Sequence, residues 1–320
     1  MSFQILQGDC IEQLKQLDDG IVQTCVTSPP YWGLRDYGAE GQLGLEPTPE
    51  EYVANMVEVF REVKRVLRDD GTVWLNLGDS YANTKAGNTN EAPDKKPRPY
   101  FESGTHKMVF KKTIPAGLKP KDLVGIPWLV AFALRADGWY LRSDIIWHKL
   151  NPMPESVTDR PTKSHEYIFL LSKSQKYFYD AEAIKEDSVD SESINGRRKR
   201  NPYKGCGEKG FEVRGGFSEI EDGKTYPTRN KRSVWTVSTQ PYPGAHFATF
   251  PPKLIEPCIL AGSKQGDTVL DPFAGSGTTL WVSEQNGRDS IGIELNPEYI
   301  ELINKRMDNM QMNLFMTGVI

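Results

Sequence analysis

Cysteine is scarce in this chain of 320 residues, and its thiols are scattered. The four cysteines are Cys10, Cys25, Cys206 and Cys258, and no two of them stand in C-x-x-C spacing. Disulfide frameworks and structural zinc sites both depend on clustered thiols. The sequence therefore predicts reduced thiols, with neither a disulfide scaffold nor a metal site.

Long apolar runs are lacking as well. No stretch approaches the ~20 apolar residues that cross a bilayer. The first ten residues, MSFQILQGDC, contain no basic segment followed by an apolar core, and a secretory signal has both features. We therefore expect no membrane association and a cytoplasmic location.

Two phosphate-binding signatures are also absent. No G-K-[ST] tripeptide occurs in the sequence, so a Walker-type loop is excluded. In the turn that contains Gly275 and Gly277, Leu280 stands where the dinucleotide fingerprint has its third glycine. These absences favour a cofactor without a pyrophosphate over ATP or NAD.

The charge of the chain is unevenly distributed. The net charge is −4, yet residues 195–232 contain eleven Lys and Arg against five Asp and Glu, interleaved with aromatic residues and glycines. Such a segment is typical of a region that contacts nucleic-acid phosphates, although a solvated loop has the same composition. The candidate nucleic-acid contacts are Arg197, Arg198, Lys199, Arg200, Arg229, Lys231 and Arg232.

Strand and helix patterns alternate along the chain, which predicts an α/β fold. A helix is expected to begin after Thr48 with Pro49 at its first position and to stop at Gly71. Residues 81–120 are rich in Asn, Lys, Pro and Gly, so we expect a flexible surface loop there. The other expected elements are strands in 3–9, 21–28, 72–79 and 163–174, a helix in 10–20, and strand and helix pairs in 123–149, 250–279 and 289–307.

A strand, a glycine turn and a helix start follow one another in residues 267–279, DTVLDPFAGSGTT. Glycines let a backbone approach a ligand, and the N–H groups of the next helix face it. A second apolar strand ends at Glu294, twenty-three residues after Asp271, where a carboxylate can accept hydrogen bonds from ribose hydroxyls. The pair predicts a site for an adenosine-bearing ligand. Because it lies late in the chain, we expect a circularly permuted sheet.

The tetrapeptide Ser28-Pro29-Pro30-Tyr31 directly follows an apolar strand, where an open α/β sheet presents loops to a ligand. The prolines stiffen the backbone around the Ser28 hydroxyl and the Pro29 carbonyl. Two acceptors aimed at an aromatic amino group would free its delocalised lone pair for attack on a methyl sulfonium, and Tyr31 would stack on an extruded base. A proline turn with an incidental aromatic residue is the alternative interpretation.

Six motifs, which occur along the chain in the order found in the family, resemble those of the amino-methylating DNA methyltransferases of the beta class, in which the catalytic motif precedes the cofactor motif. TSPPYW resembles the catalytic motif and DPFAGSGTT the cofactor motif. The other four are QGD at Gly8-Asp9, RPTKSHEYIFLLSK, HFATFPPKLIEPCI and IELNPEY. The resemblance covers most of the chain and implies a Rossmann-like α/β fold that binds S-adenosylmethionine, with a circularly permuted motif order and an inserted target-recognition region.

The resemblance also implies a division of the chain and a set of cofactor contacts. Residues 1–180 would form the catalytic half, 181–240 the target-recognition region and 241–320 the cofactor-binding half. Phe273 would pack near the cofactor, Thr278 and Glu294 would hydrogen-bond it, and Asp9 would contact the adenine amino group. The remaining candidates are Asp271, Gly275, Gly277 and, in the pocket lid, Phe250 with Pro251. For Asp79 we favour capping a turn over facing the cleft.

The target base is suggested only by a tendency of the family. Serine at the first catalytic position accompanies cytosine-N4 methylation more often, and aspartate accompanies adenine-N6 methylation more often. We therefore predict cytosine, with adenine as the alternative. Carbon-5 methylation would require a thiolate, but Cys258 of the Pro257-Cys258 pair stands among helix-periodic apolar residues, so we expect a packed thiol.

The predicted function is thus site-specific methylation of double-stranded DNA in a prokaryotic or phage-infected cell. More distant alternatives are an RNA or protein methyltransferase, against which the basic segment favours DNA, and a non-catalytic nucleic-acid-binding protein. Intact Ser28, Tyr31, Gly275 and Glu294 argue against the non-catalytic alternative. A cognate restriction endonuclease is a possible partner, and a monomer or a homodimer is expected. The sequence does not choose between restriction-modification, orphan and phage roles.

Overall fold

The computed structural model describes residues 2–34, 38–39, 41–82, 114–188, 227–240 and 250–317. The chain divides into two compact units. The main unit comprises Met1–Asp180 and Arg232–Ile320, and the second unit comprises Ala181–Lys231.

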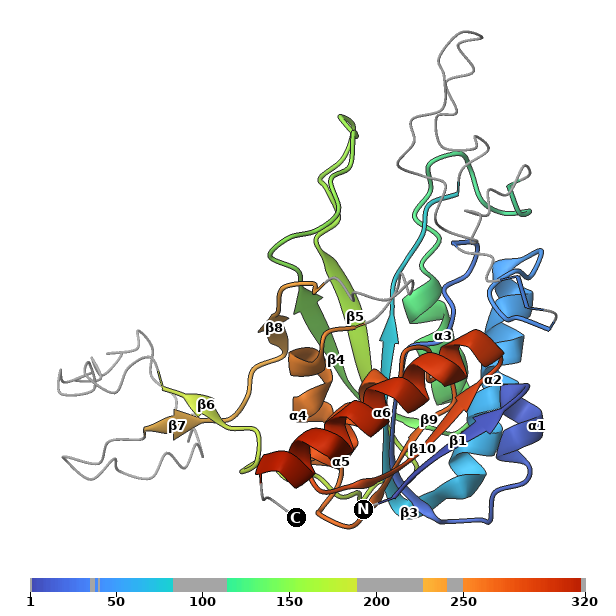
Figure 1. Ribbon diagram of the computed structural model, residues 1–320. Coiled ribbons are helices and arrows are strands. Elements are labelled where there is room, and N and C mark those ends of the chain that lie inside the picture. The colour runs from blue at the N-terminus through green and yellow to red at the C-terminus, as the bar shows by residue number, and fades with distance from the viewer. Residues whose placement is uncertain are drawn as a thin grey trace, which may run out of the picture. The chain divides into compact units, whose positions relative to one another are not determined.

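Within the described residues, the main unit is built on an eight-stranded sheet of order β1-β10-β9-β2-β3-β5-β4-β8 (Figure 1). Its strands are β1 (Phe3–Gln7), β2 (Val22–Thr27), β3 (Leu67–Leu77), β4 (Tyr140–His148), β5 (His165–Ser172), β8 (Val234–Thr236), β9 (Thr268–Asp271) and β10 (Asp289–Glu294). Neighbouring strands are parallel except at β5, which runs antiparallel to β3 and β4. The late strands β9 and β10 lie between β1 and β2, which is the permuted arrangement that the motif order predicts.

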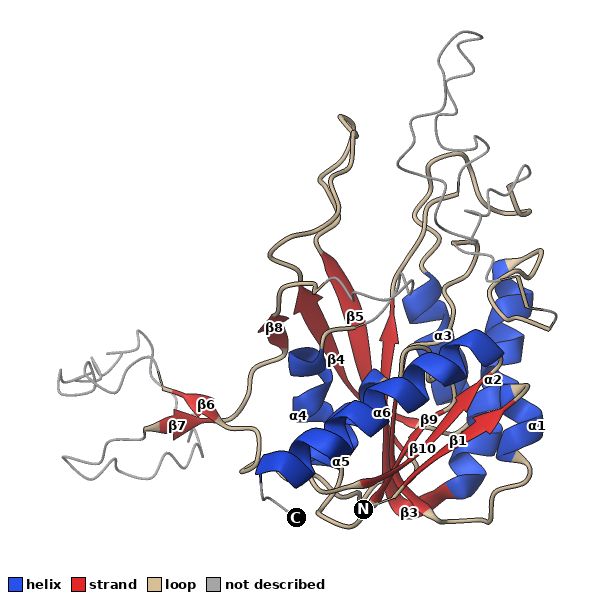
Figure 2. Cartoon of the chain, in the orientation of Figure 1, coloured by secondary structure: helices blue, strands red, loops and turns tan. Residues whose placement is uncertain are grey.

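Helices cover both faces of this sheet (Figure 2). They are α1 (Cys10–Leu14), α2 (Pro49–Val66), α3 (Ile126–Ala136), α4 (Pro252–Gly262), α5 (Thr278–Gln285) and α6 (Pro297–Thr317). On one face, Phe60 of α2 and Leu134 of α3 are buried in one cluster with Leu75 of β3. On the other face, Leu280 of α5 packs in a cluster with Ile303 of α6. The fold is therefore a three-layer α/β sandwich, as predicted.

Helix α2 begins where its sequence predicts but ends earlier. The Thr48 hydroxyl caps it by accepting from the Glu51 N–H at 3.2 Å, and Pro49 occupies its first turn. The expected stop at Gly71 is wrong, because the helix ends at Val66 and the chain passes directly into β3 at the buried Leu67. Gly71 lies within the strand, where an added Cβ would approach the Arg68 carbonyl oxygen to 2.9 Å.

Two further boundaries differ from expectation. Helix α1 ends at Leu14, well before the expected stop at Gly20. Helix α6 continues past Met307, where the sequence pattern gave no assignment, to Thr317. None of the helices in the described ranges is both long and apolar enough to span a membrane.

The described part of the second unit is a short antiparallel pair, β6 (Glu186–Asp187) with β7 (Thr228–Arg229). Arg229 Nε donates to Glu186 Oε1 across this pair at 2.9 Å. Residues 189–226 and 83–113 lie outside the described residues, so the prediction of a loop at 81–120 is not tested there. Strand β8 extends the main sheet, although its residues fall within the range 181–240 assigned to target recognition, and that functional division stays a prediction.

The Thr48 cap gives a direct test of what starts α2. Replacing Thr48 with Ala removes the hydroxyl acceptor and should lower the free energy of unfolding by about 1 kcal/mol, measured by urea denaturation. Thr48→Ser retains the acceptor and serves as the control, with a change below about 0.5 kcal/mol expected. Equal losses in the two variants would show that the cap contributes nothing.

Candidate active site

The predicted site residues follow strands that are neighbours in the sheet. Glu294 ends β10, Asp271 ends β9, and Ser28 comes directly after β2. These strands are parallel and adjacent, so their carboxyl ends lie at one edge of the sheet. In open α/β sheets this edge is where ligands bind. The structure therefore brings the predicted cofactor turn and the predicted catalytic tetrapeptide side by side.

A buried carboxylate connects the two loops. The Thr27 hydroxyl donates to Asp271 Oδ1 at 2.6 Å, and the Thr279 hydroxyl donates to Asp271 Oδ2 at 2.6 Å. The Phe273 N–H also donates to Asp271 Oδ1, at 3.1 Å. Burial raises the pKa of Asp271 to about 6, and the hydrogen bonds with Thr27 and Thr279 oppose this rise. The oxygens of Asp271 thus link β2, the turn and α5, and its expected place in the cofactor site stays a prediction.

Glu294 lies at the opening of the same turn and remains half-buried. Its Oε2 accepts from the Gly275 N–H at 2.8 Å, and its Oε1 accepts from the Asn296 N–H at 2.8 Å. Burial raises the pKa of Glu294 to about 7, partly offset by hydrogen bonds from these backbone groups. Each carboxylate oxygen has two lone-pair sites, so Glu294 can also accept hydrogen bonds from a ligand's hydroxyls.

The other predicted cofactor residues surround this turn. Asp9 caps α1 by accepting from the Ile11 and Glu12 N–H groups, and the Gly8 N–H donates to the Glu294 carbonyl oxygen at 3.0 Å. Gly277 has a φ of 72°, and an added Cβ there would lie 3.0 Å from the Ile303 side chain. Gly275 also has a positive φ, and Phe273 of the same turn is half-buried. Phe250 is buried and directly precedes Pro251, the N-cap of α4.

Thr278 is oriented into the protein. Its side chain is buried, and Arg306 of α6 donates to its hydroxyl oxygen at 3.1 Å. Arg306 also donates to the Ser276 carbonyl oxygen at 3.1 Å. These contacts from α6 stabilise the turn. The direct cofactor contacts expected of Thr278, Asp9 and Phe250 stay predictions.

The tetrapeptide predicted to be catalytic is held by a contact from helix α2. Tyr52 of α2, itself fully buried, donates its hydroxyl to the Pro30 carbonyl oxygen at 3.0 Å. The Trp32 indole N–H donates to the Glu46 carbonyl oxygen at 3.0 Å. Pro29 is buried, whereas Ser28 and Tyr31 are half-buried. The two side chains predicted to act on a base thus remain partly accessible on a rigid backbone.

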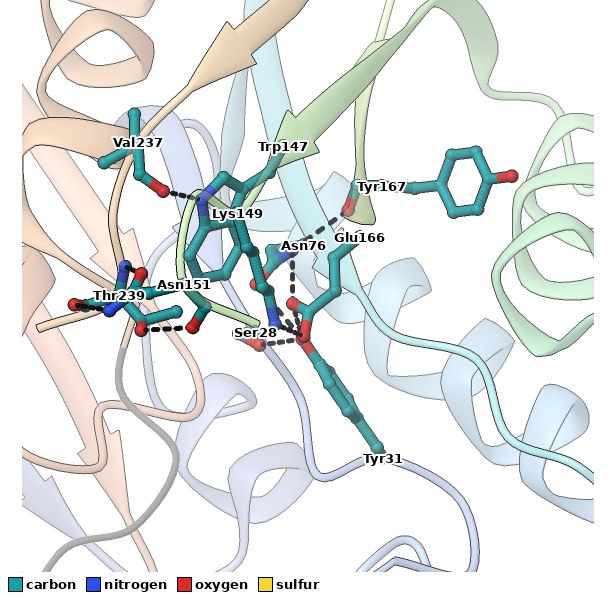
Figure 3. Close-up of polar contacts among 10 residues, drawn as sticks. All are labelled: Ser28, Tyr31, Asn76, Trp147, Lys149, Asn151, Glu166, Tyr167, Val237 and Thr239. Atoms are coloured by element: carbon teal, nitrogen blue, oxygen red, sulfur yellow. Dashed lines mark hydrogen bonds and ion pairs between the residues drawn. The ribbon is translucent and has the colours of Figure 1, made fainter. Parts of the chain in front are cut away.

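Tyr31 points toward a polar cluster that comes from three strand ends (Figure 3). Its hydroxyl oxygen lies 2.7 Å from Glu166 Oε2, 3.1 Å from Asn76 Oδ1 and 3.4 Å from Ser28 Oγ. The same carboxylate forms an ion pair with the Lys149 ammonium. Gly78 leaves room for the tyrosine ring, since a Cβ there would approach Tyr31 Cε2 to 2.5 Å.

Sequence reasoning missed Asn76, Lys149 and Glu166. Each had a signal, because each is a polar residue in or next to a run of apolar strand residues. What the sequence does not reveal is their meeting, which depends on β5 pairing antiparallel with β3 and β4. In that register Asn76 is the partner of Ile168, and Trp147 is the partner of Glu166.

The remaining candidates are placed differently. Asp79 Oδ1 accepts from the N–H groups of Gly125 and Ile126 at the start of α3, as expected for a capping residue. Cys258 is buried within α4, as expected for a packed thiol.

The proposed DNA contacts lie in or next to the second unit. Arg229 is paired with Glu186, and Lys231 and Arg232 follow it where the chain passes from the second unit to the main unit. The other proposed DNA contacts, Arg197, Arg198, Lys199 and Arg200, lie outside the described residues.

Comparison with known sequences gives matches along almost the entire chain. A family model described as DNA methylase, of the N6/N4 methyltransferases, matches residues 22–305. The Type II methyltransferase M.Cfr9I of Citrobacter freundii is 48% identical over 310 residues, which are 97% of this chain and 89% of the relative. The Type II methyltransferase M.SmaI of Serratia marcescens is 47% identical over 306 residues, 96% of this chain and 91% of the relative.

Solved structures share the fold at low sequence identity. The PvuII DNA methyltransferase, described as cytosine-N4-specific, aligns with a TM-score of 0.61 and 18% identity over 96% of this chain and 86% of that chain. M1.HpyAVI in complex with SAM aligns with a TM-score of 0.50 and 18% identity over 95% of this chain and 99% of that chain.

These comparisons confirm three predictions made from the sequence: the Rossmann-like methyltransferase fold, the resemblance to the amino-methylating enzymes, and S-adenosylmethionine as the cofactor. With the adjacent catalytic and cofactor loops, they assign the protein to a family: this chain belongs to the N6/N4 DNA methylases, and its relatives of nearly half-identical sequence are Type II methyltransferases.

Proposed function

We propose that this protein methylates the exocyclic N4 of a cytosine that is flipped out of double-stranded DNA, within a short specific sequence. The observation that carries the proposal is the position of Ser28-Pro29-Pro30-Tyr31 directly after β2, with Thr27 bonded to Asp271 of the neighbouring cofactor turn at 2.6 Å. This adjacency would place an amino group held by the tetrapeptide next to a methyl donor held by the turn.

S-adenosylmethionine supplies an electrophilic methyl group on a sulfonium. The residues present fit this cofactor, because the turn DPFAGSGTT has no basic side chain for a phosphate and ends beside the half-buried Glu294 carboxylate. Glu294 would accept hydrogen bonds from the ribose hydroxyls, and Phe273 would pack on an apolar part of the ligand. Asp9 would contact the adenine amino group, although its Oδ1 also caps α1.

The tetrapeptide would prepare the amino group of the base. The Ser28 hydroxyl oxygen and the Pro29 carbonyl oxygen would each accept one amino hydrogen, which draws the nitrogen lone pair out of conjugation with the ring. The Tyr31 ring would stack on the base, as enzymes that act on flipped bases require. Tyr52 holds the tetrapeptide through the Pro30 carbonyl oxygen, and Gly78 leaves the space that the tyrosine ring occupies.

Cytosine is favoured over adenine on two grounds. Serine at position 28 accompanies cytosine-N4 methylation more often in the family, and a protein of the same fold is described as cytosine-N4-specific. Both bases offer the same amino geometry to the tetrapeptide, so adenine-N6 methylation is the second candidate. The Type II relatives support a role in restriction-modification, and we propose a cognate endonuclease as the partner in that role.

The acceptor base can be tested in a bacterial host that lacks DNA methylation. We expect expression of the chain to produce N4-methylcytosine in one short motif, detected by single-molecule sequencing of genomic DNA. Tyr31→Ala should abolish the signal, since the base loses its stacking partner. N6-methyladenine in place of N4-methylcytosine would contradict the choice of base, and an unmodified genome would contradict the proposed function.

The raised pKa of Glu294 predicts pH-dependent cofactor binding. Below about pH 7 the carboxyl group is protonated and becomes a poorer acceptor for ribose hydroxyls. Affinity for S-adenosylmethionine should therefore fall about tenfold from pH 8 to pH 6, measured by calorimetry. Glu294→Gln has no titrating group, so its weaker affinity should lack this part of the pH dependence. Identical pH profiles for the two proteins would show that titration of Glu294 does not control cofactor binding between pH 6 and pH 8.

The basic segment 195–232 is proposed to contact DNA phosphates. Replacing Arg197, Arg198 and Arg200 with Gln should weaken DNA binding and reduce the slope of log affinity against log salt by up to about 3, because each phosphate contact releases roughly one counterion. A matched control replaces three exposed basic residues of the main unit with Gln. These residues are Lys15, Arg61 and Arg142. If the slope of log affinity against log salt falls by the same amount in both triple variants, the basic segment has no special role in contacting DNA phosphates.

A further inference from the structure

The hydrogen bonds around Tyr31 have a direction that is set by the groups at their far end. Lys149 carries only donors, and an ionised carboxylate carries only acceptors. Their ion pair therefore keeps Glu166 as an acceptor. Asn76 fixes the same carboxylate from another side, because its Nδ2 donates to the Tyr167 carbonyl oxygen at 3.0 Å and to Glu166 Oε2 at 3.3 Å.

This acceptor determines where the single hydrogen of the Tyr31 hydroxyl points. Glu166 Oε2 lies 2.7 Å from the tyrosine oxygen, whereas Asn76 Oδ1 lies 3.1 Å away. A charged acceptor at the shorter distance forms the stronger bond. Tyr31 therefore donates to Glu166, and its oxygen is left to accept from Ser28 Oγ at 3.4 Å. This last contact is long, as catalytic hydrogen bonds often are before the substrate binds.

The consequence falls on Ser28, whose hydroxyl has one hydrogen and two lone pairs. When that hydrogen points to Tyr31, both lone pairs are available on the side away from the polar cluster. Without such a partner, the serine hydroxyl could turn its own hydrogen toward the base. That hydrogen would then face an amino hydrogen of the base, and the serine oxygen could not accept a hydrogen bond from the amino group.

We propose that Glu166 and Lys149 are positioning residues that act through Tyr31 to hold Ser28 as a hydrogen-bond acceptor for the target amino group. The proposal rests on the proposed function, because it assumes that Ser28 faces an exocyclic amino group. It gives Tyr31 a second role besides stacking, since the ring would hold the base while the hydroxyl group orients Ser28. Asn76 supports the same arrangement by holding Glu166.

The burial of the cluster supports this arrangement. The pKa of Tyr31 is raised well above its usual value, first by burial and then by the Glu166 charge, so the phenol keeps its hydrogen. The Lys149 ammonium lies 4.4 Å from the centre of the Trp147 ring, which restrains it over the carboxylate. Trp147 is in turn anchored by donating its indole N–H to the Val237 carbonyl oxygen at 2.9 Å.

The test is a double-mutant cycle on the single-turnover methylation rate with saturating cofactor and DNA. Tyr31→Phe keeps the ring but removes the hydroxyl, and Glu166→Gln keeps the shape but removes the fixed acceptor. Each should slow the wild-type rate about fivefold, the usual worth of one hydrogen bond. In a Ser28→Ala background, which has no hydroxyl to orient, each should cost less than about twofold.

A second background tests the direction of the bonds. Aspartate at position 28 accepts hydrogen bonds without any orienting partner, so Ser28→Asp should also remove most of the penalty of Tyr31→Phe. Glu155→Gln is the matched control, because Glu155 pairs with Arg160 at 2.7 Å on the connection between β4 and β5. This variant should methylate at the wild-type rate. Thermal melting and cofactor affinity, measured for every variant, identify any loss of folding.

Each outcome gives a clear answer. Penalties that vanish in both backgrounds support the positioning role. Penalties of equal size with and without the Ser28 hydroxyl, or no penalty in the wild-type background, overturn it and leave Glu166 with a structural role. Failure of the wild-type protein to methylate any DNA amino group would instead refute the proposed function, which separates the two failures.

Discussion

The arrangement of the site depends on the buried carboxylate of Asp271. Two hydroxyl groups and one backbone N–H donate to it, and they come from the catalytic strand β2, from helix α5 and from the turn between β9 and α5. A buried carboxylate is costly unless it is well hydrogen-bonded. The hydrogen bonds that offset this cost also join the loop after β2 to the turn after β9. A shift of either loop would break some of these bonds and leave the buried carboxylate without those donors. The relative position of the sites proposed for the methyl donor and for its acceptor is therefore fixed in the core.

Strand β2 lies between the two chemical environments that the reaction needs. On one side is β9 with the cofactor turn, and on the other is β3, followed by β5 with its polar cluster. Ser28 belongs to both neighbourhoods, because it follows Thr27 of the Asp271 contacts and lies 3.4 Å from the Tyr31 hydroxyl. One loop can thus be fixed by a core interaction while its side chains respond to an ion pair between Glu166 of β5 and Lys149, which follows β4.

The sequence predicts the parts of the site that are local and misses those that depend on strand pairing. Ser28, Asp271 and Glu294 could be proposed because each ends or directly follows an apolar strand at a recognisable turn. Asn76, Lys149 and Glu166 could not, because their meeting depends on an antiparallel register between β5 and its neighbours. Gly71 was misread for a similar reason, since the glycine rule for helix ends does not foresee a strand that begins at Leu67. The DNA contacts proposed for the basic segment 195–232 are a different case, because they would form only with a bound partner.

The insertion of β9 and β10 between β1 and β2 has a consequence for biosynthesis. The first two strands to leave the ribosome, β1 and β2, do not pair with each other. The strands β10 and β9, which are synthesised late, lie between them in the sheet. Such long-range pairing slows folding and exposes strand edges in the meantime. A nascent or truncated chain would possess the catalytic tetrapeptide without the turn that serves it. A premature stop before the end of β9 would therefore yield an inert polypeptide in place of a partly active enzyme.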